Sequence, residues 1–235
     1  MYRNMRQSMN IQKEIKTISL SLPFRMGNVN CYLIEVGTGY ILIDSGGSNS
    51  RKELVRVLEN AGCQPGLLGL IILTHGDFDH TGNAAYLRRA FGCKIAMHPD
   101  DAGMAECGDM FVNRNKPNII IRNLLPVFSG FGKPERFGPD LLVHDGDDLS
   151  RYGFNARIIS IPGHSKGSIG ILTADADFFC GDLLVNTDKP VLNSLIDDLT
   201  AGYASLQKME TMSIGTVYPG HGKPFPLPLL DIGST

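Results

Sequence analysis

The stretch Thr74-His75-Gly76-Asp77-Phe78-Asp79-His80 carries two imidazoles and two carboxylates within a few residues. It directly follows residues 70–73, an apolar run that predicts a buried strand. Four potential ligands at this spacing after a strand indicate a metal site rather than a polar turn. Imidazole suits zinc and iron, and carboxylate oxygen also suits harder cations, so these residues leave the identity of the metal open.

Predicted strands and helices alternate around this stretch. Apolar spacing and glycine punctuation predict, in order, strands at 15–22, 29–36 and 40–44, a helix at 48–62, a strand up to 74, a helix at about 82–91 and a strand at 94–98. The first three strands form an opening meander. Alternation of this kind predicts an α/β fold in which helices pack outside a sheet.

The regular spacing of apolar residues is lost at about 99–139, where glycines, prolines and short apolar patches allow at most a short helix near 101–107. We interpret this region as an insertion or lid. Regular patterns then resume, with predicted strands at 141–143, 156–161, 168–173 and 177–180, a helix at 195–212 and a last strand at 216–218. The length of 235 residues is compatible with a single domain covering 1–235.

Composition narrows the possible partners and the compartment. With 43% hydrophobic residues the chain can bury a large core, and 22 basic against 24 acidic residues give no reason to expect nucleic acid as a partner. The five cysteines form no Cys-x-x-Cys pair, which suits reduced thiols in a cytoplasmic protein. The start lacks a secretory apolar region, and no apolar run reaches the 20 or so residues that a membrane span needs. We therefore expect a cytoplasmic protein without a membrane partner.

Three further candidate ligands lie at the ends of predicted strands, each in a turn that contains glycine. They are His164 in Pro162-Gly163-His164, Asp182 in Cys180-Gly181-Asp182, and His221 in Pro219-Gly220-His221. Glycine allows the backbone to turn sharply and direct the next side chain inward. A single loop histidine or aspartate is usually solvated. The repetition of one arrangement at three strand ends favours a shared site.

The order of these residues along the chain resembles the metallo-β-lactamase superfamily, whose pattern is His-x-His-x-Asp-His followed by a distant His, an Asp and a final His. The resemblance extends from Ile15 to Phe225 and includes the turn at Asp44, which would support the site. It implies a four-layered αββα sandwich of two mixed β-sheets with helices outside.

The resemblance also implies a ligand set for two divalent metal ions that share a hydroxide. Zinc is favoured, and iron and manganese are the alternatives. The first ion would be held by His75, Asp77 and His164, and the second by Asp79, His80 and His221, with Asp182 as the bridge. In this scheme Asp79 and Asp182 are the catalytic carboxylates.

One position departs from the family pattern, because Asp77 stands where the second histidine is most common. That histidine binds through Nδ1, which is as many bonds from Cα as an aspartate oxygen, so Asp77 can reach the same ion. Alternatively, Asp77 misses the metal and hydrogen-bonds a ligand. A carboxylate at this position also resembles the pattern of the flavodiiron proteins, members of the superfamily that have Glu there and bind two irons.

The resemblance favours a hydrolase that cleaves an ester, thioester, lactone or amide of a small molecule. The sequence of residues 162–168 resembles that of the glyoxalase-II-like branch of the superfamily. Lys166 within this segment could bind a substrate carboxylate. The chain ends fourteen residues after His221, which leaves no room for the glutathione-binding domain of that enzyme, and Val185 stands where the lactonases commonly have Tyr. The alternatives are a di-iron oxidoreductase and a non-catalytic scaffold stabilised by metal.

Overall fold

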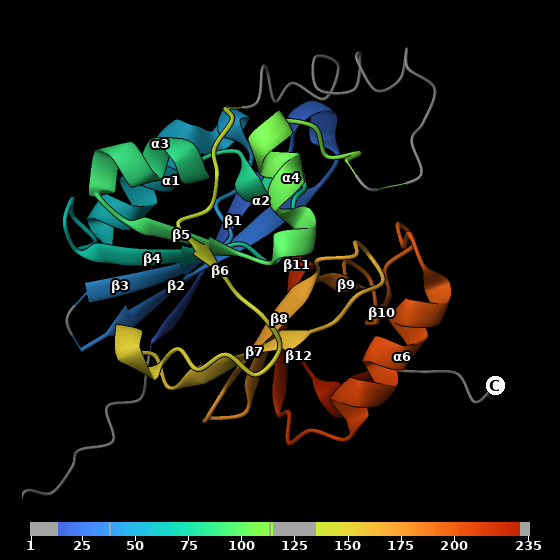
Figure 1. The fold of residues 1–235 in the computed structure, drawn as a ribbon. Helices are drawn as coiled ribbons and strands as arrows, with labels where there is room; N and C mark the ends of the chain where they lie inside the picture. Colours follow the sequence, from blue (N-terminus) through green and yellow to red (C-terminus); the bar gives the residue numbers. More distant parts are fainter. Residues whose placement is uncertain (1–13, 38, 113, 115–134, 231–235) are drawn as a thin grey trace, which may run out of the picture.

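The computed structural model describes residues 14–37, 39–112, 114 and 135–230, and two six-stranded sheets dominate it (Figure 1). The first sheet has its strands in sequence order: β1 (Ile15–Ser21), β2 (Asn28–Val36), β3 (Gly39–Ile43), β4 (Leu68–Ile72), β5 (Lys94–Met97) and β6 (Leu141–Leu142). The opening meander β1–β2–β3 is antiparallel, as predicted, whereas β3 to β6 pair in parallel.

The second sheet is mixed as well. Its strands are β7 (Ala156–Ser160), β8 (Ile169–Thr173), β9 (Asp177–Asn186), β10 (Val191–Leu192), β11 (Thr216–Gly222) and β12 (Phe225–Pro226). The order is β12-β11-β9-β8-β7, and β10 pairs with β9 beside this path. Only β11 and β9 pair in parallel among these strands. This parallel pair carries two of the candidate ligands.

Helices cover the outer faces of both sheets. The α-helices are α1 (Arg51–Asn60), α2 (Phe78–Thr81), α3 (Ala84–Phe91), α4 (Pro99–Cys107) and α6 (Leu199–Glu210), and the short 3-10 helices are η1 (Pro23–Arg25), η2 (Ser48–Ser50), η3 (Ser150–Tyr152) and η4 (Leu227–Leu229). Figure 1 shows α1 and α3 over the first sheet and α6 over the second. The predicted four-layered αββα architecture is thereby confirmed.

Three apolar clusters fill the three spaces between these four layers. In β3 the side chain of Leu42 packs with α1 and α3, whereas Ile41 and Ile43 pack between the two sheets. This alternation follows from the two-residue period of a strand. Phe178 lies in the third cluster, between the second sheet and α6, and its neighbour Phe179 lies between the sheets. Both sheets are therefore buried on both faces and form a rigid base for the site.

Two strands continue further than the sequence predicts. β9 does not stop at 180 but runs through Asp182, and β11 does not stop at 218 but runs through His221. Each strand is locally irregular at the glycine turn but continues beyond it. Gly181 has φ 50°, and the pairing of β11 with β9 shifts its register around Pro219. The expectation that these two ligands follow strand ends was wrong, although the glycines do redirect the chain.

Two helices are shorter than predicted, and the region 99–139 is described only in part. The helix predicted at 48–62 divides into η2 and α1, and the helix predicted at 195–212 begins only after Asp198, whose side chain caps α6 by accepting from the Ala201 N–H. The predicted short helix near 101–107 is α4. Most of the predicted lid lies outside the described residues.

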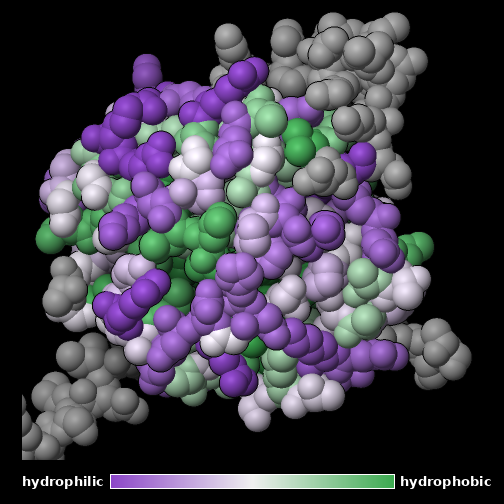
Figure 2. Space-filling model, in the orientation of Figure 1, coloured by the Kyte–Doolittle hydropathy of each residue, from purple (hydrophilic) through white to green (hydrophobic). Residues whose placement is uncertain are grey.

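The face of the molecule drawn in Figure 2 is mainly polar. Figure 2 shows hydrophilic residues over most of the visible face and a hydrophobic strip where β5 and β6 lie at the open edge between the sheets. Leu142 at this edge is 54% exposed. Within the described ranges, no helix is both long enough and apolar enough to cross a membrane.

Candidate metal centre

The motif 75–80 lies where the parallel strands β3 and β4 end side by side. Asp44, just after β3, accepts hydrogen bonds from the backbone N–H of Thr74 at 2.8 Å and from the Thr74 hydroxyl at 2.8 Å. It takes a positive φ of 58° and is 1% exposed, so its carboxylate is held inside the turn. Asp44 therefore fixes the start of the loop that carries the motif.

The loop turns immediately into the short helix α2, with Asp77 as its N-cap residue. The backbone N–H groups of His80 and Thr81 both donate to the Asp77 carbonyl. This tight turn places Asp77, Asp79 and His80 on one side of the loop. Local geometry thus gathers the motif's own side chains before any distant residue contributes.

The structure brings all seven predicted side chains together. Three groups have potential ligand atoms within 4.8 Å of one another: His75, Asp77 and His164; His75, His80 and Asp182; and Asp79, His80 and His221. The shortest separations are 3.1 Å between Asp77 Oδ2 and His164 Nε2, and 3.2 Å between Asp182 Oδ2 and His221 Nε2. The first and third groups contain the two ligand sets implied by the resemblance. The second places Asp182 among residues of both sets.

All four histidines direct Nε2 towards the cluster, because each Nδ1 lies within hydrogen-bond distance of an oxygen atom outside it. Thr74 Oγ1 lies 2.9 Å from His75 Nδ1, and Asp44 Oδ2 lies 2.9 Å from His80 Nδ1. The carbonyl oxygen of Leu195 accepts from His164 Nδ1 at 2.6 Å, and that of Asn28 accepts from His221 Nδ1 at 2.7 Å. A proton on Nδ1 leaves the Nε2 lone pair free to bind a cation.

The second sheet is tied to the first at the point where His221 enters the site. The Asn30 side-chain amide donates to the Pro219 carbonyl at 3.1 Å and to the Gly222 carbonyl at 2.7 Å. The Tyr32 hydroxyl donates to the same Pro219 carbonyl at 2.5 Å. These bonds join β2 to the irregular part of β11, so they set the distance between His221 and the motif.

Several inward-facing atoms are buried without a hydrogen-bond partner among the described residues. They are His75 Nε2, His80 Nε2 and Asp182 Oδ1; the last two lie 3.3 Å apart but without the geometry of a hydrogen bond. Leaving such a group unpaired costs roughly 1–3 kcal/mol, so buried orphans usually indicate a ligand at that place. Two imidazole lone pairs and a carboxylate oxygen that face each other suit a cation. The residues present therefore fit the divalent ions implied by the sequence pattern.

The electrostatics of the cluster also favour positive charge. Burial alone would lower the pKa of His221, but the carboxylates of Asp182 and Asp79 raise it to about 10. Burial would likewise lower the pKa of His80, yet Asp182 and Asp44 shift it well above its usual value. The pKa of His75 is lowered by burial and by the neighbouring His80 and His164. The carboxylates thus stabilise a cation in the half of the cluster around His80 and His221.

A cavity of about 430 Å³ opens onto the cluster. Asp77, Asp79, His164, Asp182 and His221 face it, and its remaining walls come from Leu22, Met26, Gly27, Asn28, Phe78, Met110, Val185, Thr187, Asn193 and Leu195. A small molecule in this cavity would contact the candidate ligands directly. The cluster is therefore open to a substrate on one side, as catalytic metal sites are.

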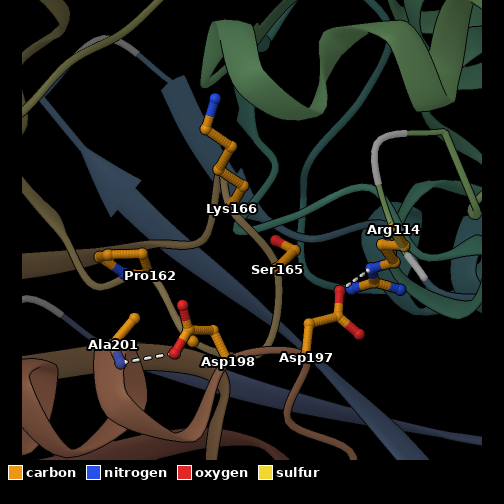
Figure 3. A pocket seen from close by; sticks show the side chains of 8 residues that line it. Arg114, Pro162, Ser165, Lys166, Asp197, Asp198 and Ala201 are labelled. Atoms are coloured by element: carbon orange, nitrogen blue, oxygen red, sulfur yellow. Dashed lines mark hydrogen bonds and ion pairs between the residues drawn. The ribbon is translucent and has the colours of Figure 1, made fainter.

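Lys166 does not line this cavity. It lines a separate pocket of about 350 Å³ together with Arg114, Asp197 and Asp198, and Figure 3 shows its side chain extending away from Arg114 and Asp197. The side chain is 71% exposed and lies 3.4 Å from the Asp100 carboxylate. The structure therefore does not bring Lys166 to the cavity at the cluster, where it would have to lie to bind a substrate carboxylate.

We expect Lys166→Ala to change kcat/KM by less than about twofold, because an exposed ion pair contributes little and the ammonium does not reach the cavity. Steady-state kinetics on a hydrolysed substrate measures this. A tenfold increase in KM with unchanged kcat would instead support the original hypothesis of an anion contact.

Two further residues contact the loops of the site without a signal in the sequence, and both come from the region interpreted as an insertion. Arg114 donates from Nη1 to Asp77 Oδ1 at 2.5 Å. Asp101, in α4, is fully buried and accepts from the Gly76 N–H at 3.0 Å, from the Ser165 hydroxyl at 2.6 Å and from the Gly167 N–H at 2.8 Å. Asp101 thereby connects the loop of His75 to the loop of His164.

Comparison with known proteins agrees with this geometry. The sequence pattern of the metallo-beta-lactamase superfamily matches residues 25–221, a range that includes all seven candidate ligands. The chain belongs to this superfamily. The resemblance that the motif order suggested is thereby confirmed.

Among individual members of the superfamily, the chain is similar to the hydroxyacylglutathione hydrolase GloC of Haemophilus influenzae, with 29% identity over 168 residues that cover 69% of this chain and 70% of that enzyme. It is also similar to a probable metallo-hydrolase of Methanocaldococcus jannaschii, with 28% identity over 83% of this chain and 87% of that protein. A crystal structure of TTHA1623 in a di-iron-bound form has 27% identity and a TM-score of 0.70, covering 91% of this chain and 96% of that one.

Proposed function

We propose that this protein is a metal-dependent hydrolase that cleaves an ester, thioester, lactone or amide of a small molecule with two divalent ions, preferably zinc. The observation that carries this proposal is the convergence of seven imidazole and carboxylate side chains, five of which face an open cavity, with buried Nε2 and Oδ1 atoms left unpaired. The similarity to a hydroxyacylglutathione hydrolase supports the hydrolytic reaction class.

His75, Asp77 and His164 would hold one ion, and Asp79, His80 and His221 the other, with Asp182 between them. Two such ions supply Lewis acidity and lower the pKa of water towards neutrality. The protein's own contribution is orientation: the oxygen partner of each Nδ1 fixes the corresponding imidazole plane. Asp79, whose side chain is 19% exposed, also faces the cavity; its Oδ2 lies 3.4 Å from His221 Nε2, so its other oxygen, Oδ1, can accept or return a proton.

The walls of the cavity favour an uncharged, largely apolar substrate. Leu22, Met26, Phe78 and Leu195 supply apolar surface, and Val185 leaves space that a larger side chain would fill. Within the described part of the chain, no lysine or arginine lines this cavity. Among the described residues, a strongly anionic substrate would meet no ammonium or guanidinium group in this cavity. We therefore propose a neutral acyl compound, in preference to a glutathione thioester.

The test is a substrate panel assayed with protein purified without added metal. We expect about two zinc ions per chain, hydrolysis of neutral acyl esters or thioesters that improves with acyl chain length, and weaker activity on a glutathione thioester. A chelator should abolish the activity and zinc should restore it. Full activity in protein freed of metal would refute the proposal, and metal-loaded protein without activity on the panel would favour the scaffold alternative.

A di-iron oxidoreductase is the second candidate. Two observations favour it: the carboxylate of Asp77 within the first set, and the di-iron-bound form of TTHA1623 among similar structures. Carboxylate ligands suit harder ions, iron included. Elemental analysis with an optical spectrum separates the candidates, because a colourless protein that contains zinc and no iron would exclude this one.

A further inference from the structure

The side chain of Arg114 contacts Asp77 and lines the pocket of Lys166 rather than the cavity that opens onto the cluster. Only 7% of this side chain is exposed, and it makes three contacts. Nη1 donates to Asp77 Oδ1 at 2.5 Å, Nη2 donates to the His164 carbonyl at 3.2 Å, and Nε lies 2.7 Å from Asp197 Oδ2. Figure 3 shows the ion pair of Arg114 with Asp197. The guanidinium is therefore held from two sides.

These contacts divide the two oxygens of Asp77 between two tasks. Oδ1 is occupied by Arg114, whereas Oδ2 lies 3.1 Å from His164 Nε2 and 3.8 Å from His75 Nε2. The carboxylate thus presents one oxygen to the first ligand set, as an imidazole would present one nitrogen. Arg114 also binds the backbone of His164, so it positions two of the three members of that set.

The charges of the cluster also favour a cation at the position of Arg114. The cluster already contains the carboxylates of Asp79 and Asp182, and Asp77 adds a third where an imidazole would be neutral. A buried guanidinium in contact with that carboxylate offsets the added negative charge, since Coulomb interactions are strong where water is excluded. Arginine suits this place because its guanidinium stays protonated and can donate hydrogen bonds to two groups at once.

We propose that Arg114 is a positioning residue that turns Asp77 into a one-oxygen, charge-compensated metal ligand, equivalent to the histidine common at this position. This inference rests on the proposed two-metal centre. It predicts that Asp77 and Arg114 work only as a pair. Histidine at position 77 should then bind metal poorly while Arg114 remains, because the guanidinium would keep only Asp197 as an ionic partner and its positive charge would face the imidazole and the nearby ion.

A double-substitution cycle tests this, with zinc affinity and stoichiometry measured by chelator competition on metal-free protein. The proteins are the unmodified chain, Asp77→His, Arg114→Met and Asp77→His combined with Arg114→Met. We expect Asp77→His to weaken zinc binding at one site by at least about tenfold, and the added Arg114→Met to recover most of that loss. A double variant that binds zinc no better than Asp77→His would overturn the inference.

A second measurement covers the case in which Asp77→His does not fold. Without Arg114, both oxygens of Asp77 become available, so Arg114→Met should shift the ratio of zinc to manganese affinity towards manganese by about tenfold. Arg114→Lys, which keeps the charge, should shift the ratio less. An unchanged ratio in Arg114→Met would also overturn the inference. If the unmodified chain binds no metal at all, the proposed function itself fails.

Discussion

The Asp182→Ala variant is expected to lose at least about 10³-fold in kcat and to retain no more than one zinc ion per chain. The two oxygens of Asp182 contact two different histidines: Oδ1 lies 3.3 Å from His80 Nε2, and Oδ2 lies 3.2 Å from His221 Nε2. Asp182 also groups with His75 of the first set. Its removal should therefore separate the two ligand sets. Losing the several kcal/mol that a second ion supplies corresponds to about three orders of magnitude in rate.

The measurement combines zinc content with steady-state kinetics on a hydrolysed substrate. Asp188→Ala provides a matched control, because Asp188 is an exposed carboxylate shortly after the end of the same strand. This control should keep two ions and the activity of the unmodified chain. If Asp182→Ala kept full turnover, the two-metal mechanism would be wrong, whereas loss in both variants would indicate a general defect of this strand.

Local patterns predicted an α/β fold with helices outside a sheet and the seven candidate ligands, whereas the four layers and the grouping of those ligands were implied by the resemblance to the metallo-β-lactamase superfamily. Strand and helix periods are local properties, and the apolar alternation in β3 and β4 records which faces are buried. The motif 75–80 likewise gathers four ligands in one turn. Such features need no knowledge of distant contacts.

Contacts between distant segments could not be predicted in this way. Arg114 meets Asp77 across 37 positions, in a region where the sequence shows neither strand nor helix periodicity. The orientation of His221 depends on a backbone carbonyl 193 positions away, at Asn28, and backbone carbonyls carry no sequence signal. The continuation of β11 through His221 depends on its pairing with β9, which overrides the turn preference of Pro219-Gly220.

Asp101 illustrates this limit, because it stands beside Asp100 in a Pro-Asp-Asp sequence that is typical of a helix N-terminus. From the sequence the two carboxylates are equivalent. In the structure Asp101 is fully buried, whereas the Asp100 side chain is 38% exposed and pairs with Lys166 at the surface. The packing of α4 on the site loops distinguishes them.

The Asp101→Ala variant is expected to lose about 3 kcal/mol or more in the free energy of unfolding of the metal-free protein. The substitution removes the acceptor for three buried donors, and each unsatisfied donor costs roughly 1–3 kcal/mol. Two of these donors, the N–H of Gly76 and the hydroxyl of Ser165, adjoin His75 and His164 in the chain. Zinc affinity at the first set should therefore fall together with stability. Denaturant titration and chelator competition measure the two effects.

Asp100→Ala is the matched control, since it removes the same group one position earlier in the same helix. Because its ion pair with Lys166 is exposed, we expect a change within about 0.5 kcal/mol and unaltered zinc binding. Equal destabilisation by both substitutions would mean that the N-terminus of α4, rather than the buried hydrogen bonds, determines stability. Loss of stability in Asp101→Ala alone, with weakened binding at one zinc site, is the result expected if Asp101 holds the loops of His75 and His164 together.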